Sequence, residues 1–194
     1  VADFAPNVFV SIAPSGAVTL IAPNSEMGQG INTVALQVAV HELGIDGNLI
    51  DVIVDTTREL GLGQTTGSRG TLMGAGAVKD ACDTAKAANC AVGVDHYGEY
   101  RVDWTTKLGD PDVVNPIIHS TFGYAAQMVV MDRDSNKIER VVAAHDVGKA
   151  VNPQLCEGQI EGSVHMGLGY ALSEDLPSDP ETGFPINTTL RSLK

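Results

Sequence analysis

The chain has 194 residues and carries 12 Lys and Arg against 24 Asp and Glu, a formal net charge of −12. Such an acidic chain repels phosphate backbones, and no basic patch compensates, which argues against a nucleic-acid partner. No uninterrupted apolar run is long enough to span a membrane. The three cysteines are too few and too scattered for a disulfide framework or a zinc ribbon. We therefore expect a soluble, cytoplasmic globular chain, and its start at Val1 without Met indicates a fragment of a longer protein.

The first predicted element is a β-hairpin. Val8, Val10 and Ile12 alternate with other residues and so place their apolar side chains on one face of a strand. The residues at 13–16 are typical of a tight turn, and residues 17–21 run back as the second strand.

Two helices are predicted next, each after a loop that contains glycine. The loop at 24–30 precedes an apolar helical stripe that starts at Ile31 and ends before Gly44, and a strand follows at 49–54. The loop at 61–70 precedes a helix rich in small residues. Its buried stripe is predicted to consist of Ala77, Val78, Ala81, Cys82, Ala85 and Ala88.

The second half repeats this order. Strands are predicted at 124–131 and 138–144, and a loop leads to a helix over 155–173. The stretch between the halves is poorly patterned, with one candidate strand at 98–104. Both halves are predicted to contain a hairpin, a loop and a helix in the same order. We therefore predict an α+β fold of two related lobes, each a β-hairpin or sheet packed against helices. The predicted lobes are residues 1–92 and 93–194.

The loop before the first helix is a candidate binding site. Gln29 lies between Gly28 and Gly30 at the predicted positive end of that helix. A phosphate or a polar heterocycle could bind there, since a carboxamide offers both donors and an acceptor. The alternative is an ordinary turn whose Gln29 side chain faces solvent.

Two more glycine-rich segments carry polar groups. Thr66, Gly67, Ser68 and Arg69 precede the second helix and could hold an anion, although a flexible loop with a helix cap explains them as well. The glycine spacing at 61–67 misses the dinucleotide-binding fingerprint, which argues against a nucleotide-dependent oxidoreductase. In the last helix Gly158 and Gly162 leave one face bare, for a ligand or for close packing. The five histidines show no spacing typical of metal ligands.

Taken together, these loops resemble those of the molybdenum hydroxylase family, which includes xanthine dehydrogenases and aldehyde oxidases. The resemblance covers nearly the whole chain and corresponds to the second molybdenum-cofactor-binding domain of the large catalytic subunit. Residues 98–100 and 104–109 are further similar to the selenium-dependent xanthine dehydrogenase branch. The motifs that carry the family resemblance are Glu26–Gly30, Thr66–Arg69, Ala144–Pro153, Glu157–Gly162 and Met166–Tyr170.

The resemblance implies a molybdopterin-type molybdenum cofactor, including its cytosine dinucleotide form. Gln29 would bind the pterin near the metal, residues 66–69 would hold the phosphate or nucleotide tail, and Gln159 would bind another polar edge. No residue would ligate the metal, because the family holds molybdenum through sulfur atoms of the cofactor. The implied cofactor-binding residues are Gly28, Gln29, Gly30, Thr66, Gly67, Ser68, Arg69 and Gln159.

The implied activity is that of an oxidoreductase that hydroxylates a purine or related N-heterocycle using water. An aldehyde oxidoreductase of the same family and a non-catalytic structural or assembly module are the alternatives. The implied partners are the rest of its own large subunit, a small heterocyclic substrate, and iron–sulfur and FAD domains or subunits. The family's catalytic glutamate, which follows a Gly-x-Gly motif, is missing from residues 1–194. We therefore expect no catalytic residue in this chain and no activity from it alone.

Overall fold

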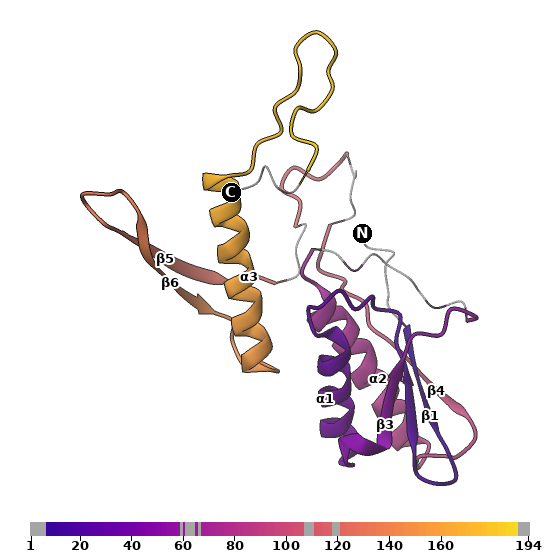
Figure 1. Ribbon diagram of the computed structural model, residues 1–194. Coiled ribbons are helices and arrows are strands. Elements are labelled where there is room, and N and C mark those ends of the chain that lie inside the picture. The colour runs from indigo at the N-terminus through magenta and orange to yellow at the C-terminus, as the bar shows by residue number, and fades with distance from the viewer. Residues whose placement is uncertain are drawn as a thin grey trace. The chain divides into compact units, whose positions relative to one another are not determined.

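The computed structural model describes residues 7–58, 60, 65, 67–106, 111–117 and 121–189. The contacts of the chain divide it into two compact units, Val1–Phe122 and Gly123–Lys194. Each unit contains an antiparallel pair of strands followed by a helix (Figure 1). The α+β class is therefore confirmed, whereas the lobe boundary between residues 92 and 93 stays a prediction.

A four-stranded mixed sheet, in the order β3-β2-β1-β4, forms the framework of the first unit. β1 (Asn7–Ile12) pairs antiparallel with β2 (Val18–Ile21), which confirms the predicted hairpin. β3 (Ile50–Ile53) lies parallel to β2, and β4 (Asp95–Glu99) lies antiparallel to the other edge of β1.

Two helices pack on this sheet. α1 (Ile31–Leu43) begins at the predicted residue and ends at Gly44, whose φ of 67° suits glycine and whose N–H donates to the carbonyl of Val40. A one-turn 3-10 helix, η1 (Gly47–Leu49), leads into β3. α2 (Ala75–Ala87) also lies where the sequence predicts it.

A short π-helix, η2 (Gly70–Gly74), precedes α2 and was not expected from the sequence. Segments of this kind are rare and are found frequently at functional sites. Here η2 connects the second glycine-rich loop to the first full turn of α2.

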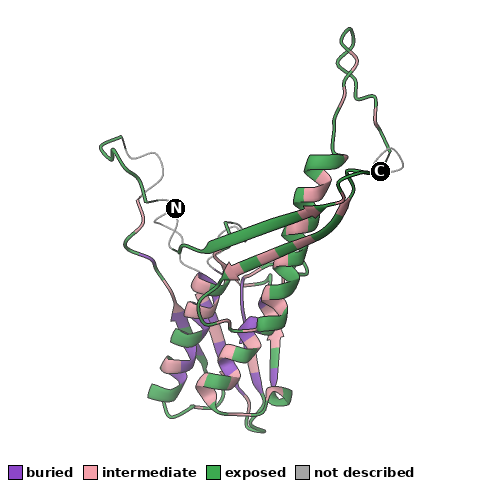
Figure 2. Cartoon of the chain, turned by 90° about the vertical axis from the view of Figure 1, so that its left-hand side faces the viewer, coloured by how far each residue is buried: buried purple, intermediate pink, exposed green. Residues whose placement is uncertain are grey.

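The core of the first unit lies between the sheet and the two helices. Val8, Val10 and Leu20 from the sheet are fully buried, and so is Cys82 from α2. Figure 2 shows buried residues in purple on the strands and helices of this unit. The predicted stripe of α2 is confirmed except for Ala88, which follows the end of the helix and is exposed. Burial raises the pKa of the Cys82 thiol to about 12, so this cysteine acts as a packed apolar side chain at neutral pH.

β4 begins three residues before the predicted strand at 98–104 and overlaps it only at residues 98 and 99, so the predicted bounds were wrong. Its two buried residues are His96 and Gly98, neither of which marks a core strand by hydropathy. His96 satisfies its Nε2 atom at 3.0 Å from the carbonyl of Ala91. Buried and exposed residues thus alternate along β4. The buried ones are a histidine and a glycine, which a search for alternating apolar side chains does not detect.

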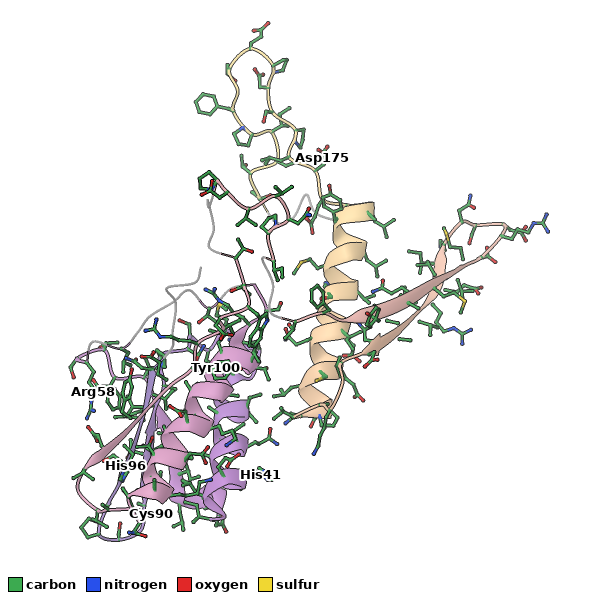
Figure 3. All side chains as sticks on the ribbon, turned by 180° about the vertical axis from the view of Figure 1, so that it is seen from behind. His41, Arg58, Cys90, His96, Tyr100 and Asp175 are labelled. Carbon is green, nitrogen blue, oxygen red and sulfur yellow. The ribbon has the colours of Figure 1, made fainter. Side chains whose placement is uncertain are left out.

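α2 approaches its neighbours closely at two glycines. A Cβ on Gly98 would lie only 2.1 Å from the backbone nitrogen of Ala81, and a Cβ on Gly76 would lie 2.6 Å from Cγ of Tyr100. Tyr100, labelled in Figure 3, follows β4 directly. Only glycine fits at either position, and this close packing fixes the height of α2 above the sheet.

The second unit is a hairpin with one long helix. β5 (Tyr124–Met131) and β6 (Ile138–Asp146) form an antiparallel pair, and α3 (Pro153–Leu172) follows. Asn152 caps α3 by accepting the N–H of Leu155 at 3.0 Å. All three elements were predicted within two residues of their observed bounds. No helix in the described part of the chain is long and apolar enough to cross a membrane.

Candidate functional site

The structure brings the first two predicted loops together at one end of the first unit. The N–H of Ser25 donates to Oγ1 of Thr65 at 3.1 Å, across forty positions of sequence. At the starts of the helices, a Cβ on Gly70 would lie 3.2 Å from Cδ1 of Ile31. The two loops that were candidates for separate sites therefore border one another.

The helices behind these loops run in the same direction. Their starts meet at Ile31 and Gly70, and further along Nζ of Lys86 donates to Glu42 near the end of α1, at 2.9 Å. Because a helix carries partial positive charge at its N-terminus, the positive ends of two helices lie side by side here. Such an arrangement favours a ligand with negative charge or with hydrogen-bond acceptors.

A carboxylate from the first loop caps α1. Oε1 of Glu26 accepts the N–H groups of Gly28 and Gly30, both at 2.9 Å, and Oε2 accepts the N–H of Asn32 at 3.1 Å. These hydrogen bonds, first of all the one from Asn32, lower the pKa of Glu26. Gly30 occupies the N-cap position with φ 83° and has no side chain to accept a bond, so Glu26 supplies the cap from upstream.

Gln29 is held inside the same loop. Its Oε1 accepts the N–H of Met27 at 2.6 Å, and its Nε2 donates to the carbonyl of Ser25 at 2.7 Å. A carboxamide has two donor hydrogens and two lone pairs, so the described residues leave one of each for a ligand. Gly28 beside it has φ 93°, and no described atom lies within 4 Å of its Cβ position. The loop is thus fixed in shape while space remains open above it.

The second loop has an unusual backbone. Gly67 and Ser68 have φ values of 65° and 52°, so a non-glycine residue occupies the left-handed region, at a cost of about 1–2 kcal/mol. Both residues are exposed, and half-buried Arg69 follows at the start of η2. Strain of this kind is typical of binding sites. Thr66 lies outside the described residues. Residues 61–64 also lie outside them, and these contain two of the glycines whose spacing we compared with the dinucleotide-binding fingerprint.

The third predicted group belongs to the second unit. Gln159 is exposed on α3, and no described atom lies within 4 Å of a Cβ placed on Gly158 or Gly162. The bare helix face that the sequence predicts is therefore present. The convergence of Gln159 with Gln29 and Ser68 on one site stays a prediction.

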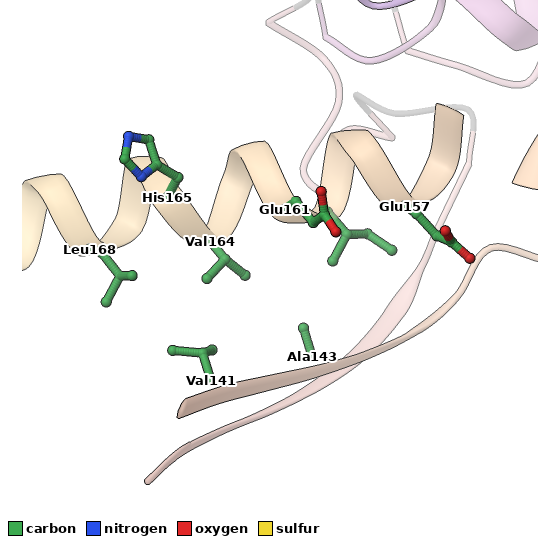
Figure 4. Close-up of a pocket in the computed structure, with 8 residues that line it drawn as sticks. Val141, Ala143, Glu157, Glu161, Val164, His165 and Leu168 are labelled. Carbon is green, nitrogen blue, oxygen red and sulfur yellow. The ribbon is translucent and has the colours of Figure 1, made fainter. Parts of the chain in front are cut away.

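An open groove of about 410 Å³ separates α3 from β6 within the second unit. In Figure 4, Val164 and Leu168 point from α3 towards Val141 on β6, with Glu157 and Glu161 along the same helix. The full lining is Val141, Ala143, Glu157, Ile160, Glu161, Val164, His165 and Leu168. Its floor is apolar, so it resembles an uncovered packing surface more than a polar cofactor site.

Other chemistry-bearing residues do not form a second centre. No group of three or more His, Cys, Asp or Glu side chains among the described residues could hold a metal ion. Asp146 follows His145 at the end of β6. Oδ1 of Asp146 accepts the N–H of Gly148 at 2.9 Å, so this carboxylate stabilises the following turn.

The paired loops fit a cofactor with a polar head and an anionic tail. Among the residues that the structure describes, none occupies the second donor or the second acceptor site of Gln29, and none fills the space above Gly28. The second loop adds the exposed hydroxyl of Ser68 and the guanidinium of Arg69, a residue type suited to phosphate. Residues 24–30 and 67–69 can therefore hold such a group by hydrogen bonds without supplying a metal ligand.

Two contributors to this site were not singled out from the sequence. Glu26 entered only as part of a motif, and Thr65 was not considered as the link between the loops. A signal for Glu26 exists in the sequence, because a helix that starts after glycine lacks a side-chain cap and needs an acceptor from elsewhere. The link through Thr65 joins segments far apart in the chain, and no local pattern reports it.

Comparisons with known proteins point to one family. The molybdopterin cofactor-binding domain family matches residues 2–97 and 84–194, which together cover nearly the whole chain. Aldehyde oxidase 4 of Rattus norvegicus is 26% identical over 201 residues, and xanthine dehydrogenase/oxidase of Mus musculus is 28% identical over 199 residues. Each alignment covers 89% of this chain but only 15% of the relative, so the chain spans a small part of these enzymes.

A solved structure agrees in fold. CO dehydrogenase from Oligotropha carboxidovorans superposes with a TM-score of 0.78 at 20% identity, over 97% of this chain and 28% of that one. The fold, the loop motifs and the family match are thus mutually consistent. The chain belongs to the molybdopterin cofactor-binding domain family of the molybdenum hydroxylases.

Proposed function

We propose that the chain is the second cofactor-binding domain of a xanthine dehydrogenase-like molybdenum hydroxylase, built from lobes at 1–92 and 93–194. The observation that carries this proposal is the contact between two polar loops at the adjacent N-termini of α1 and α2. The cofactor-binding residues in this proposal are Gly28, Gln29, Gly30, Thr66, Gly67, Ser68, Arg69 and Gln159.

Each group has a separate part in binding. Gln29 offers its remaining donor and acceptor to the pterin edge, in a loop that its own hydrogen bonds hold in shape. Ser68 and Arg69 bind the anionic tail, which in the cytosine dinucleotide form is a pyrophosphate, and Gln159 binds another polar edge. When bound, the cofactor supplies the redox chemistry that hydroxylates the substrate with oxygen from water. The chain's own residues bind and orient it, and none of them is catalytic.

The substrate in this proposal is a purine or a related N-heterocycle. Two observations support it: the likeness to mouse xanthine dehydrogenase/oxidase, and the likeness of residues 98–100 and 104–109 to the selenium-dependent branch. Lys107–Gly109 in the second of these motifs lie outside the described residues. An aldehyde is the second candidate, supported by the comparable identity to rat aldehyde oxidase 4.

The complete enzyme would be cytoplasmic and would contain further parts. Because the chain corresponds to only 15% of rat aldehyde oxidase 4 and of mouse xanthine dehydrogenase/oxidase, we propose that the rest of its large subunit contributes the catalytic glutamate and the remaining cofactor contacts. Iron–sulfur and FAD domains or subunits would then carry electrons away from the substrate.

The test uses the complete enzyme that contains this chain, purified from its native host. We expect molybdenum and pterin in near-equal amounts, and we expect xanthine to yield urate faster than benzaldehyde yields benzoate. The reverse order of rates would favour the aldehyde candidate. Protein that lacks both molybdenum and pterin would refute the proposal and favour a non-catalytic module.

A further inference from the structure

The N-termini of α1 and η2 lie side by side, but among the described residues only that of α1 binds a carboxylate of the chain itself, that of Glu26. At α1 the first backbone hydrogen bond of the helix runs from Val34 to Gly30, so the N–H groups of residues 30–33 have no partner within the helix. The carboxylate of Glu26 accepts two of these, from Gly30 and Asn32, and in addition the N–H of Gly28. Two of the four donors that an external phosphate would use are therefore already engaged.

The start of the other helix carries no such anion among the described residues. No side chain caps η2, no acidic residue lies in its first turn, and the cation Arg69 immediately precedes it. A phosphate at α1 would meet the charge of Glu26 at close range. Charges of like sign at about 4 Å repel by about 1 kcal/mol in water and by more near a protein surface.

We propose that Glu26 is a specificity-determining residue that closes the N-terminus of α1 to anions. The loop at 24–30 then accepts an uncharged hydrogen-bonding edge through Gln29. The identity of the ligand rests on the proposed function, but the exclusion of anions is a property of this chain alone.

The test titrates inorganic phosphate into the full 194-residue chain and follows the backbone amide signals of Gly28, Gly30 and Asn32 by NMR. In the wild type we expect these signals to stay in place. In Glu26→Ala we expect them to shift saturably, with half-saturation at a phosphate concentration at least about tenfold lower than any wild-type response.

A matched control removes a carboxylate of the same charge that caps a much shorter helix. Asp46 accepts the N–H of Asn48 at 2.9 Å in front of the three-residue η1, so Asp46→Ala should leave the phosphate response of Gly28 and Gly30 as in the wild type. If Glu26→Ala does not fold, Glu26→Gln decides. Glu26→Gln keeps an acceptor oxygen but loses the charge, so its phosphate response should lie between those of the wild type and of Glu26→Ala.

Equal phosphate responses in wild type and in the Glu26 variants would overturn the proposal, and so would the lack of any response in the variants. Because phosphate is the probe, this result is independent of molybdenum. An enzyme that lacks molybdenum would refute the proposed function and leave the exclusion of anions intact.

Discussion

The two units share an order of elements but differ in burial. In the first unit, sheet and helices enclose a core in which Val8, Leu20 and Ala81 are fully buried. In the second unit no residue of α3 is buried, and Tyr124 and Tyr170 are 78% and 80% exposed. A two-stranded hairpin with one helix lacks a further layer to cover its apolar faces. The first unit therefore builds its loops on its own core, whereas the described residues leave the apolar faces of the second unit exposed.

The largest effect is expected where α2 touches β4. In Gly98→Ala the new methyl group would meet the backbone of Ala81, which cannot rotate away as a side chain can. We expect the first unit to lose more than about 3 kcal/mol of stability. Urea unfolding followed by circular dichroism measures this, and an unchanged midpoint would contradict the packing described here.

A leucine pair compares the cores of the two units directly. Leu20 is fully buried and Leu172 on α3 is 70% exposed. Leu20→Ala should cost about 2–5 kcal/mol, because it leaves a cavity in the sheet core. Leu172→Ala should change the stability of the isolated chain by less than about 0.5 kcal/mol. Similar losses in both variants would show that the second unit has a core of its own.

The Glu26 cap makes the stability of the first loop depend on pH. Its pKa in the folded chain lies below the ordinary 4.5, so its contribution is present above pH 4.5 and is lost as the pH falls through the lower folded value. For this exposed group we expect no more than about 0.3–1 kcal/mol. Glu26→Gln should remove that part of the acid dependence, as measured by unfolding at pH 7 and pH 4. An identical pH profile in the variant would argue against the cap.

The smallest effect on stability is expected at a glycine of α3, where the substitution should stabilise the chain and not destabilise it. No described atom lies near a Cβ on Gly158, so Gly158→Ala should stabilise the helix of the isolated chain by about 0.5–1 kcal/mol. In the complete enzyme the same change should be neutral or destabilising if another surface packs there. Thermal unfolding of both forms tests this, and stabilisation of equal size in the two would mean that nothing covers this face.

Local patterns predicted most of the fold. Alternation fixed β1, and helical periodicity fixed the buried stripe of α2, because burial on one face constrains side chains at regular intervals. The same reasoning failed for β4, whose buried positions are His96 and Gly98, and it did not foresee η2. Those features depend on how closely α2 approaches the sheet, which is a tertiary property.

The candidate site was predicted only loop by loop. Closely spaced glycines in the sequence indicated both loops as candidate sites. In the structure Gly28, Gly30 and Gly67 have positive φ, a conformation that favours glycine. The bond from Ser25 to Thr65 that joins them could not be read from either segment. The sequence did not show that Glu26 reaches the start of α1, because this contact exists only in the folded loop. Whether the loop at 24–30 binds a phosphate stays a prediction.

The most direct test of the cofactor site is the molybdenum content per subunit of the complete enzyme. We expect Gln29→Ala and Ser68→Ala to lower cofactor affinity about tenfold each, since an unpaired buried polar group costs about 1–3 kcal/mol. Ser15→Ala, in the exposed turn between β1 and β2, should retain the full content. Loss of molybdenum from the two loop variants alone would support the account, and full occupancy in both would contradict it.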